Sequence, residues 1–150
     1  MSTFTPPDPD WEARLRRSFA AQPFMGLLGA TLEDVSPGRV SIRLPLRPAL
    51  GQHHGHAHAG AAWSIADSAA GFAAQSMMTP EEEVLTVELK INLIRPAQGA
   101  SLLATGQVIR AGRQLVVGNA EVEAEDATGT RRLIATTLGT FIRLREKAAD

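Results

Sequence analysis

The sequence of 150 residues contains no cysteine, which excludes disulfide bonds, thiolate metal ligands and a cysteine nucleophile. This absence fits a reducing compartment, and we expect a cytoplasmic protein. An excess of basic residues is missing as well, since the formal net charge is -1. Domains that bind nucleic acid are usually strongly basic. We therefore expect no nucleic-acid partner, whereas a small anionic ligand is compatible with this charge.

Long apolar runs are also scarce. Residues 1–15 contain no apolar core of signal-peptide length. Residues 59–78 approach the length of a membrane span, but the charge of Asp67 and the many alanines make this segment a poor candidate. We expect neither export nor a membrane partner. The length fits a single domain over residues 1–150, with flexible tails at residues 1–9 and 146–150.

The most informative segment begins as a histidine cluster at residue 53 and continues as a small-residue helix over about residues 59–78. A surface helix shows a polar face at a spacing of 3.6 residues, whereas this one is apolar or small on most sides, so we expect it to be buried. Its one charge is Asp67. Burying a lone carboxylate is costly, so Asp67 should either pair with an arginine from a strand or carry out chemistry.

The flanking segments predict an α+β fold. Residues 10–21 have the spacing of an amphipathic helix that ends at Pro23, and residues 27–46 alternate like a β-hairpin. After the central helix, alternation at period two predicts strands at residues 84–96, 101–110, 114–125 and 131–145. In the first of these strands, Leu85, Val87, Leu89, Ile91 and Leu93 should form a buried face opposite Thr86. We expect a curled antiparallel sheet wrapped around the long central helix, with a short N-terminal helix.

The segment QHHGHAHAGAAWSIAD, residues 52–67, resembles the signature of the hotdog-fold acyl-CoA thioesterases of the phenylacetate-degradation (PaaI-like) type. That signature is an Asn, a Gly and a His-Gly-Gly at the start of the central helix, with an acidic residue nine positions after the histidine. The matching residues here are Gly55, His58, Gly60 and Asp67. Gln52 stands in place of the Asn and Ala59 in place of the first Gly of His-Gly-Gly. The resemblance covers about residues 25–145 and implies the hotdog fold.

The resemblance also implies hydrolysis of an acyl-CoA thioester to a free acid and CoA. In that reading Asp67 acts as general base or nucleophile, and Thr86 positions the attacking water. The N–H of Ala59, at the positive end of the helix dipole, forms the oxyanion hole beside Gly60. Gln52 holds the thioester carbonyl through its side-chain amide. His58 is expected to orient the loop by a hydrogen bond.

Substrate binding and assembly are implied in the same way. Arg95, Arg110 and Arg113 are candidates for the CoA phosphates, and Trp63, Phe72, Met77 and Met78 for the acyl group. We expect a homo-oligomer, either a dimer or a tetramer, with active sites at the dimer interface. No cofactor is expected, because CoA is part of the substrate. His54, His56 and His58 would share one face of an extended segment, but no acidic ligand lies near them, and we expect no metal.

Three other readings stay open on the sequence. A hotdog domain could bind acyl-CoA without cleaving it, because Gln52 and Ala59 depart from the signature. A hotdog enoyl-CoA hydratase would share the fold, but its Asp and His stand in an order that this chain lacks. A metal-binding β-barrel of cupin type would need a Glu soon after the paired histidines, and none is present.

Overall fold

The structure is a computed structural model that describes residues 4–145. Its elements in chain order are α1 (Trp11–Ala20), α2 (Pro23–Leu28), β1 (Thr31–Ser36), β2 (Arg39–Pro45), the short 3-10 helix η1 (Pro48–Leu50), α3 (Ala59–Gln75), β3 (Glu82–Leu93), β4 (Ser101–Ala111), β5 (Leu115–Glu125) and β6 (Arg131–Arg145). No helix in residues 4–145 combines the length and apolar character needed to cross a membrane.

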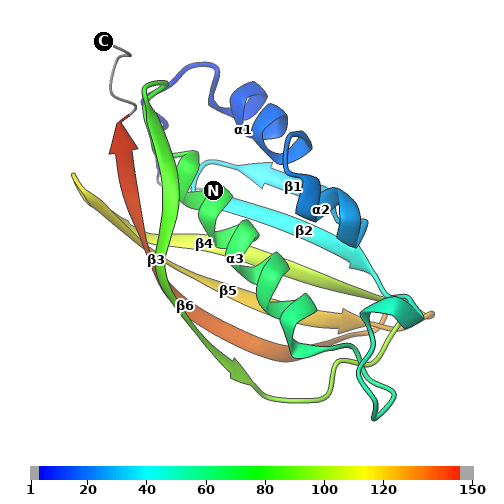
Figure 1. The fold of residues 1–150 in the computed structure, drawn as a ribbon. Helices are drawn as coiled ribbons and strands as arrows, with labels where there is room; N and C mark the ends of the chain where they lie inside the picture. Colours follow the sequence, from blue (N-terminus) through cyan, green and yellow to red (C-terminus); the bar gives the residue numbers. More distant parts are fainter. Residues whose placement is uncertain (1–3, 146–150) are drawn as a thin grey trace.

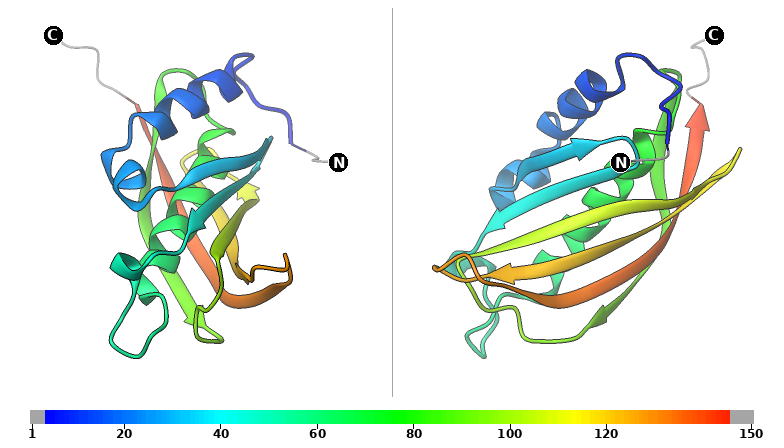
Figure 2. Two further views of the ribbon diagram at one scale, coloured as in Figure 1. Left: turned by 90° about the vertical axis from the view of Figure 1, so that its right-hand side faces the viewer. Right: turned by 180° about the vertical axis from the view of Figure 1, so that it is seen from behind.

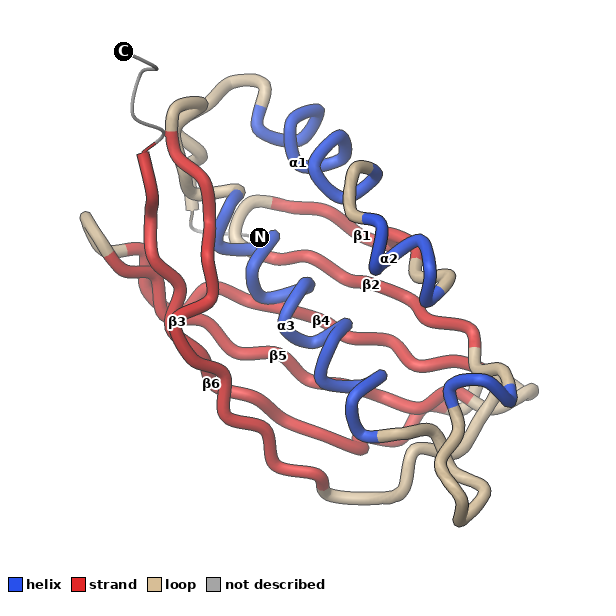
Figure 3. The backbone as a smooth tube through the Cα atoms, viewed as in Figure 1, coloured by secondary structure: helices blue, strands red, loops and turns tan. Residues whose placement is uncertain are grey.

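The strands form one antiparallel sheet in the order β1-β2-β4-β5-β6-β3. Figures 1 and 2 show this sheet curling around α3, while α1 and α2 lie beside β1 at one side. The tube in Figure 3 shows that α3 runs along the concave side of the sheet. The predicted α+β hotdog architecture, with a curled sheet around a central helix, is confirmed.

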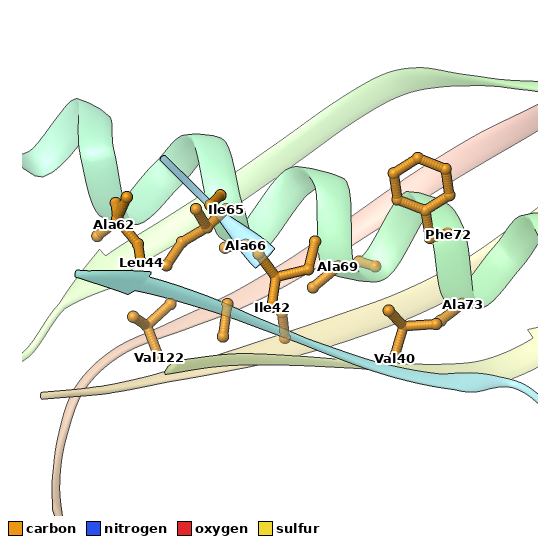
Figure 4. Close-up of a cluster of buried hydrophobic side chains, with 14 of the residues drawn as sticks. Val40, Ile42, Leu44, Ala62, Ile65, Ala66, Ala69, Phe72, Ala73 and Val122 are labelled. Atoms are coloured by element: carbon orange, nitrogen blue, oxygen red, sulfur yellow. The ribbon is translucent and has the colours of Figure 1, made fainter. Parts of the chain in front are cut away.

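Small side chains on α3 let the helix approach the sheet closely. Ala66, Ala69 and Ala73 have no exposed surface, and Figure 4 shows Ala69 and Ala73 lying against Ile42 and Val40 of β2. The closest approach is at Gly106 of β4. A methyl group on Gly106 would overlap the backbone of Ala69 and Ala70. The predicted burial of the central helix is therefore confirmed, and no side chain fits between the helix and β4 at Gly106.

The N-terminal region departs from the expectation in two places. Pro23 does not end the helical region but opens α2, because proline suits the first turn of a helix. Gly29, with φ 79°, then caps α2 by donating to the carbonyl of Met25, so the first strand begins at Thr31 rather than at residue 27. The expected tail at residues 146–150 lies outside the described residues.

The described part of the expected N-terminal tail is held in place by Arg14. Its Nε donates to buried Asp8 at 2.8 Å, and its Nη2 donates to the carbonyl of Met78 at 2.7 Å. These contacts tie Asp8 to α1 and to the segment that follows α3. The carbonyl of Met78 is available because α3 ends at Gln75, three residues before the predicted end.

The buried face predicted for the strand after the helix is only partly correct, since Leu89 and Ile91 pack against the core but Leu85 and Val87 do not. A β-bulge between Thr86 and Glu88 reverses the alternation, so Thr86 points toward α3 instead of away from it. Leu85, Val87 and Leu93 are each more than half exposed in the single chain. The bulge turns Leu85 and Val87 away from α3, and among the described strands β3 pairs with β6 alone. This leaves exposed apolar side chains beside an edge of β3 that no described strand covers.

We expect Gly106→Ala to lower the free energy of unfolding by about 1–3 kcal/mol or more, because the added methyl must displace the helix backbone. Gly71→Ala is the matched control. A methyl there meets only the ring of Phe141 at 3.8 Å, and alanine favours a helix interior over glycine by about 1 kcal/mol. Denaturant unfolding at one protein concentration measures both, and equal stability of the two variants would contradict the close-approach argument.

Candidate active site

The first turn of α3 presents a free backbone donor. His58 is the N-cap residue, and its Nδ1 accepts a hydrogen bond from the N–H of Gly60 at 2.8 Å. The N–H of Ala61 donates to the carbonyl of His58. The N–H of Ala59 has no acceptor among the described residues, and it lies at the positive end of the helix dipole. Ala59 does not have a positive φ, so its side chain causes no strain where the resembling signature has glycine.

Gln52 lies beside this donor. Its side-chain Oε1 accepts a hydrogen bond from the N–H of His54, which leaves the side-chain NH₂ group to donate. Gln52 and Ala59 line one pocket of about 310 Å³ together with Arg95 and the apolar end of β3. This pocket therefore offers a side-chain amide donor, a backbone donor and a cation, which suits a carbonyl attached to an anionic group.

Asp67 lies two turns further along α3 and faces β3. Thr86 Oγ1 donates to Asp67 Oδ1 at 2.7 Å. Within residues 4–145 Asp67 forms no ion pair, so the expected alternative of an arginine partner is not what the structure shows. Asp67 and Thr86 line a second pocket, of about 450 Å³, between α1, α3 and β3. A half-buried carboxylate that opens on a pocket and lacks a cation is suited to accept a proton or attack a substrate.

The pKa of Asp67 is raised above its ordinary value because burial disfavours the charged carboxylate. The hydrogen bond from Thr86 opposes this effect, since it stabilises the charged form. A raised pKa makes the carboxylate a stronger base than an exposed aspartate. The pair thus holds a basic carboxylate in one orientation.

The proposed oxyanion donor and the proposed catalytic carboxylate lie far apart within one chain. Asp67 follows Ala59 by eight positions on α3, which is about 12 Å at 1.5 Å per residue. A carbonyl that accepts a hydrogen bond from Ala59 is therefore beyond the reach of a water held by Asp67 of the same chain. The two residues also line different pockets.

The remaining candidates are more scattered. Arg95 joins the Ala59 pocket, where it also donates to the carbonyl of Leu133 at 2.8 Å. Arg110 and Arg113 lie on the β4–β5 hairpin, at the other end of the sheet. Trp63 is partly exposed on α3. The described residues contain no group of three His, Cys, Asp or Glu side chains placed to hold a metal ion.

Comparison with known proteins identifies the family. The sequence profile of the Thioesterase superfamily matches residues 54–130, which include Ala59, Asp67 and Thr86. The chain belongs to the Thioesterase superfamily. A solved thioesterase family protein from Silicibacter pomeroyi is 41% identical, with a TM-score of 0.88 over 90% of this chain and 98% of that one. The family resemblance predicted from the sequence is confirmed.

Other relatives of this superfamily member carry hydrolase names. A Halobacterium salinarum protein that carries an esterase name is 31% identical over 81% of this chain and 85% of its own length. A 1,4-dihydroxy-2-naphthoyl-CoA hydrolase from Listeria monocytogenes is 26% identical over 67% of this chain and 85% of its own length. The Escherichia coli PaaI protein shares the fold, with a TM-score of 0.79 at 20% identity over 90% of this chain and 94% of that one. The names of the Halobacterium salinarum and Listeria monocytogenes relatives support hydrolase activity.

Sequence reasoning missed three residues at the far end of the Asp67 pocket, namely Ser18, Gln75 and Glu83. Gln75 carries a signal that could have been used, because it is an amide in an otherwise apolar last turn of the central helix. Ser18 and Glu83 carry none, since each looks like an ordinary surface residue until the fold places it beside Gln75.

We expect Asp67→Asn to make the folded thioesterase-superfamily chain more stable at neutral pH than the parent. The folded pKa of Asp67 is raised, so the folded parent holds its proton more tightly than the unfolded chain does. The tighter proton binding therefore raises the parent's free energy of unfolding below the unfolded pKa, and this contribution is lost as the pH rises through the folded pKa. Asparagine does not titrate, so the Asn variant should exceed the parent in free energy of unfolding only on the alkaline side of this window.

Denaturant unfolding of both proteins at about pH 3 and about pH 8, at one fixed protein concentration, measures this difference. The gain in unfolding free energy of the Asn variant should be larger at the higher pH. A difference that is independent of pH, or that grows toward acid, would contradict the raised pKa.

Proposed function

We propose that the protein hydrolyses acyl-CoA thioesters to a free acid and CoA. The observation that carries this proposal is the Asp67 carboxylate, which is half-buried, oriented by the Thr86 hydroxyl and open to a pocket, and which has no ion-pair partner among residues 4–145. Membership of the Thioesterase superfamily supports a hydrolase, and the Listeria monocytogenes relative is named as a CoA hydrolase. The non-catalytic binding domain and the hydratase become outcomes of the test below.

The chemistry follows from the two sets of residues. Asp67 accepts a proton from a water molecule, which attacks the thioester carbonyl, or attacks that carbonyl itself. Thr86 keeps the carboxylate oriented in either case. The negative charge that develops on the carbonyl oxygen is stabilised by the Ala59 N–H and the Gln52 amide. The tetrahedral intermediate then expels the CoA thiolate, and the free acid remains.

The separation of Asp67 from Ala59 supports an active site built from two chains. Thr86 lies near the start of β3, and Leu93, at the end of β3, lines the Ala59 pocket. The edge of β3 that no described strand covers, together with the exposed apolar side chains on that strand, is suited to pairing with a second copy of β3. If two copies pair antiparallel around a two-fold axis near the middle of β3, the Thr86 end of one strand lies beside the Leu93 end of the other. Asp67 then faces the partner chain's oxyanion donors.

The same pairing gives the arginines a common role. Arg95 lies at the Leu93 end of β3. The β4–β5 hairpin, which carries Arg110 and Arg113, lies at the Thr86 end. Its position follows from the strand register, because Leu115 of β5 and Leu85 of β3 both pair with Ile142 of β6. A two-fold arrangement brings the two ends together at each site. We propose that these arginines bind the phosphates of CoA, for which guanidinium groups are well suited.

We expect Asp67→Asn to lower kcat for acyl-CoA hydrolysis by about 100- to 10,000-fold, because the amide can neither take a proton nor attack a carbonyl. Thiol release from aromatic, short-chain and long-chain acyl-CoA substrates measures the effect. Ser68→Ala is the control, since Ser68 is the neighbour of Asp67 and lines the same pocket. That control should lose much less activity than Asp67→Asn.

Three outcomes would count against the proposal. Turnover of the Asn variant within a few-fold of the parent would make Asp67 structural. Tight binding of acyl-CoA by the parent without thiol release would favour the binding-domain reading. Hydration of an enoyl-CoA without thiol release would favour the hydratase.

A further inference from the structure

One side of α3 remains accessible over about the first three turns of the helix. The half-exposed and exposed residues there recur at a spacing of four and form one stripe, which we call the α3 stripe: Ala59, Gly60, Trp63, Ser64, Asp67 and Ser68. Further along the helix α1 covers this side, where Phe19 meets the ring of Phe72 with centroids 5.7 Å apart. Trp63 is the one large side chain of the α3 stripe, and it is 38% exposed in the single chain.

Trp63 lies midway between the proposed oxyanion donor and the proposed catalytic carboxylate. It follows Ala59 by four positions and precedes Asp67 by four, so it is about 6 Å from each along the helix and on the same side. Ala59 lines the pocket of about 310 Å³, Asp67 lines the pocket of about 450 Å³, and Trp63 lines neither. Its place on the helix is therefore between the two pockets of one chain rather than inside either of them.

The shared active site proposed above determines what lies opposite Trp63. A two-fold axis that places Asp67 of one chain opposite the partner's Ala59 also places Ala59 of the first chain opposite the partner's Asp67. The two copies of α3 then run antiparallel, and the residue midway between positions 59 and 67 is the one nearest the axis. That residue is Trp63, so each Trp63 lies opposite the partner's Trp63.

The edge strand β3 gives the same position for the axis. Asp67 accepts a hydrogen bond from Thr86 at one end of this region, and Ala59 shares a pocket with Leu93 at the other. The middle of β3, near residues 89 and 90, consequently lies beside Trp63. An axis near the middle of β3 is also the one that pairs the two strand edges, so one axis serves both the helices and the strands.

The side chains of the α3 stripe favour this antiparallel contact. In a parallel arrangement the two Asp67 carboxylates would be neighbours and repel each other, whereas the antiparallel one separates them by about 12 Å along the helix direction. The residues on either side of Trp63 in the stripe are small, so the two indole rings can meet across the axis. Aromatic pairs stabilise a contact beyond the area that they bury, and tryptophan is frequent at the centre of interfaces.

We propose that Trp63 packs against the partner's Trp63 on the two-fold axis, and that this aromatic pair holds the two copies together and separates their two active sites. This inference rests on the shared site of the proposed function, but not on the identity of the substrate. Each ring has the Asp67 pocket of its own chain on one side and the Ala59 pocket of its own chain on the other. These two pockets belong to different active sites of the pair.

Cross-linking tests the position of the axis, because the chain has no cysteine of its own. A residue on a two-fold axis faces its own copy, so Trp63→Cys alone should give a covalent dimer with a short bismaleimide. Ala59→Cys and Asp67→Cys lie off the axis, and each alone should cross-link much less. A mixture of these two variants should cross-link one chain to the other. If Trp63→Cys forms dimers but cross-links no better than the off-axis variants, the proposed contact is wrong.

The strength of the contact is measured by sedimentation of two further variants. Trp63→Ala should raise the dissociation constant of the dimer by about 30-fold or more, as loss of a central aromatic residue does in other interfaces. Trp63→Phe keeps an aromatic ring and should raise it much less. Equal dissociation constants for the parent and the Ala variant would show that the aromatic pair does not hold the copies together.

The fluorescence of Trp63 reports on the same contact without altering it. Trp11→Phe leaves Trp63 as the only tryptophan, since the sequence has two. Dilution through the dissociation constant should move the emission to longer wavelength, because the ring exchanges an aromatic neighbour for water. An emission that stays constant while sedimentation shows dissociation would contradict the contact.

Failure of the inference and failure of the proposed function are distinguishable. If the parent hydrolyses acyl-CoA but Trp63→Cys shows no preference for its own copy, the inference is wrong while the proposed function stands. If Trp63→Cys cross-links as expected but the parent releases thiol from no acyl-CoA, the contact stands and the proposed function fails.

Discussion

The close contact between α3 and β4 is the constraint on which the rest of the structure depends. At Gly106 the helix backbone lies so near the strand that no side chain fits between them. Small residues on α3 make this contact continuous, and the sheet curls around the helix as a result. The contact also fixes the orientation of α3 about its axis. In that orientation Asp67 faces the edge strand β3, where Thr86 donates a hydrogen bond to it.

The position of Asp67 reflects a balance of opposing effects. Burial beside an apolar helix raises the pKa of the carboxyl, and the hydrogen bond from Thr86 lowers it. A buried charge of this kind reduces the stability of the folded chain at neutral pH, and proteins tolerate such a cost mainly where the group has a function. The β-bulge in β3 serves the same pair, because without it Thr86 would point away from α3.

Much of the fold could be predicted from the sequence because alternation and helical spacing report directly on burial. The central helix and the four strands that follow it are of this kind. α2 was missed because Pro23 is compatible with both the end and the start of a helix, and only the cap at Gly29 shows which one applies. The bulge at Thr86 left no mark in a regular alternating pattern, so the predicted faces of β3 were wrong before the bulge, at Leu85 and Thr86, and correct beyond it, at Leu89 and Ile91.

The candidate site was predictable where a local signature exists. Asp67 stood out as the one charge on an apolar helix, and the segment around Ala59 matched a family signature. Gln75 and Glu83 could not be connected by sequence, because their meeting with Ser18 depends on how α1 packs over α3 and β3. The separation of Asp67 from Ala59 within one chain could also be derived from the sequence. Both residues lie on the predicted central helix, and the helical rise per residue gives the distance between them.

The most direct test of a shared active site uses two variants in one oligomer. Ala59→Pro removes the proposed backbone donor at a helix position that accepts proline, and the preceding His58 has an extended ψ of 139° that suits it. Asp67→Ala removes the carboxylate. The two variants, co-expressed with different affinity tags and purified as mixed oligomers, should regain about half of the parental activity, because one of the two sites in each mixed pair then combines an intact Ala59 with an intact Asp67. Mixed oligomers as inactive as either variant alone would contradict the shared site.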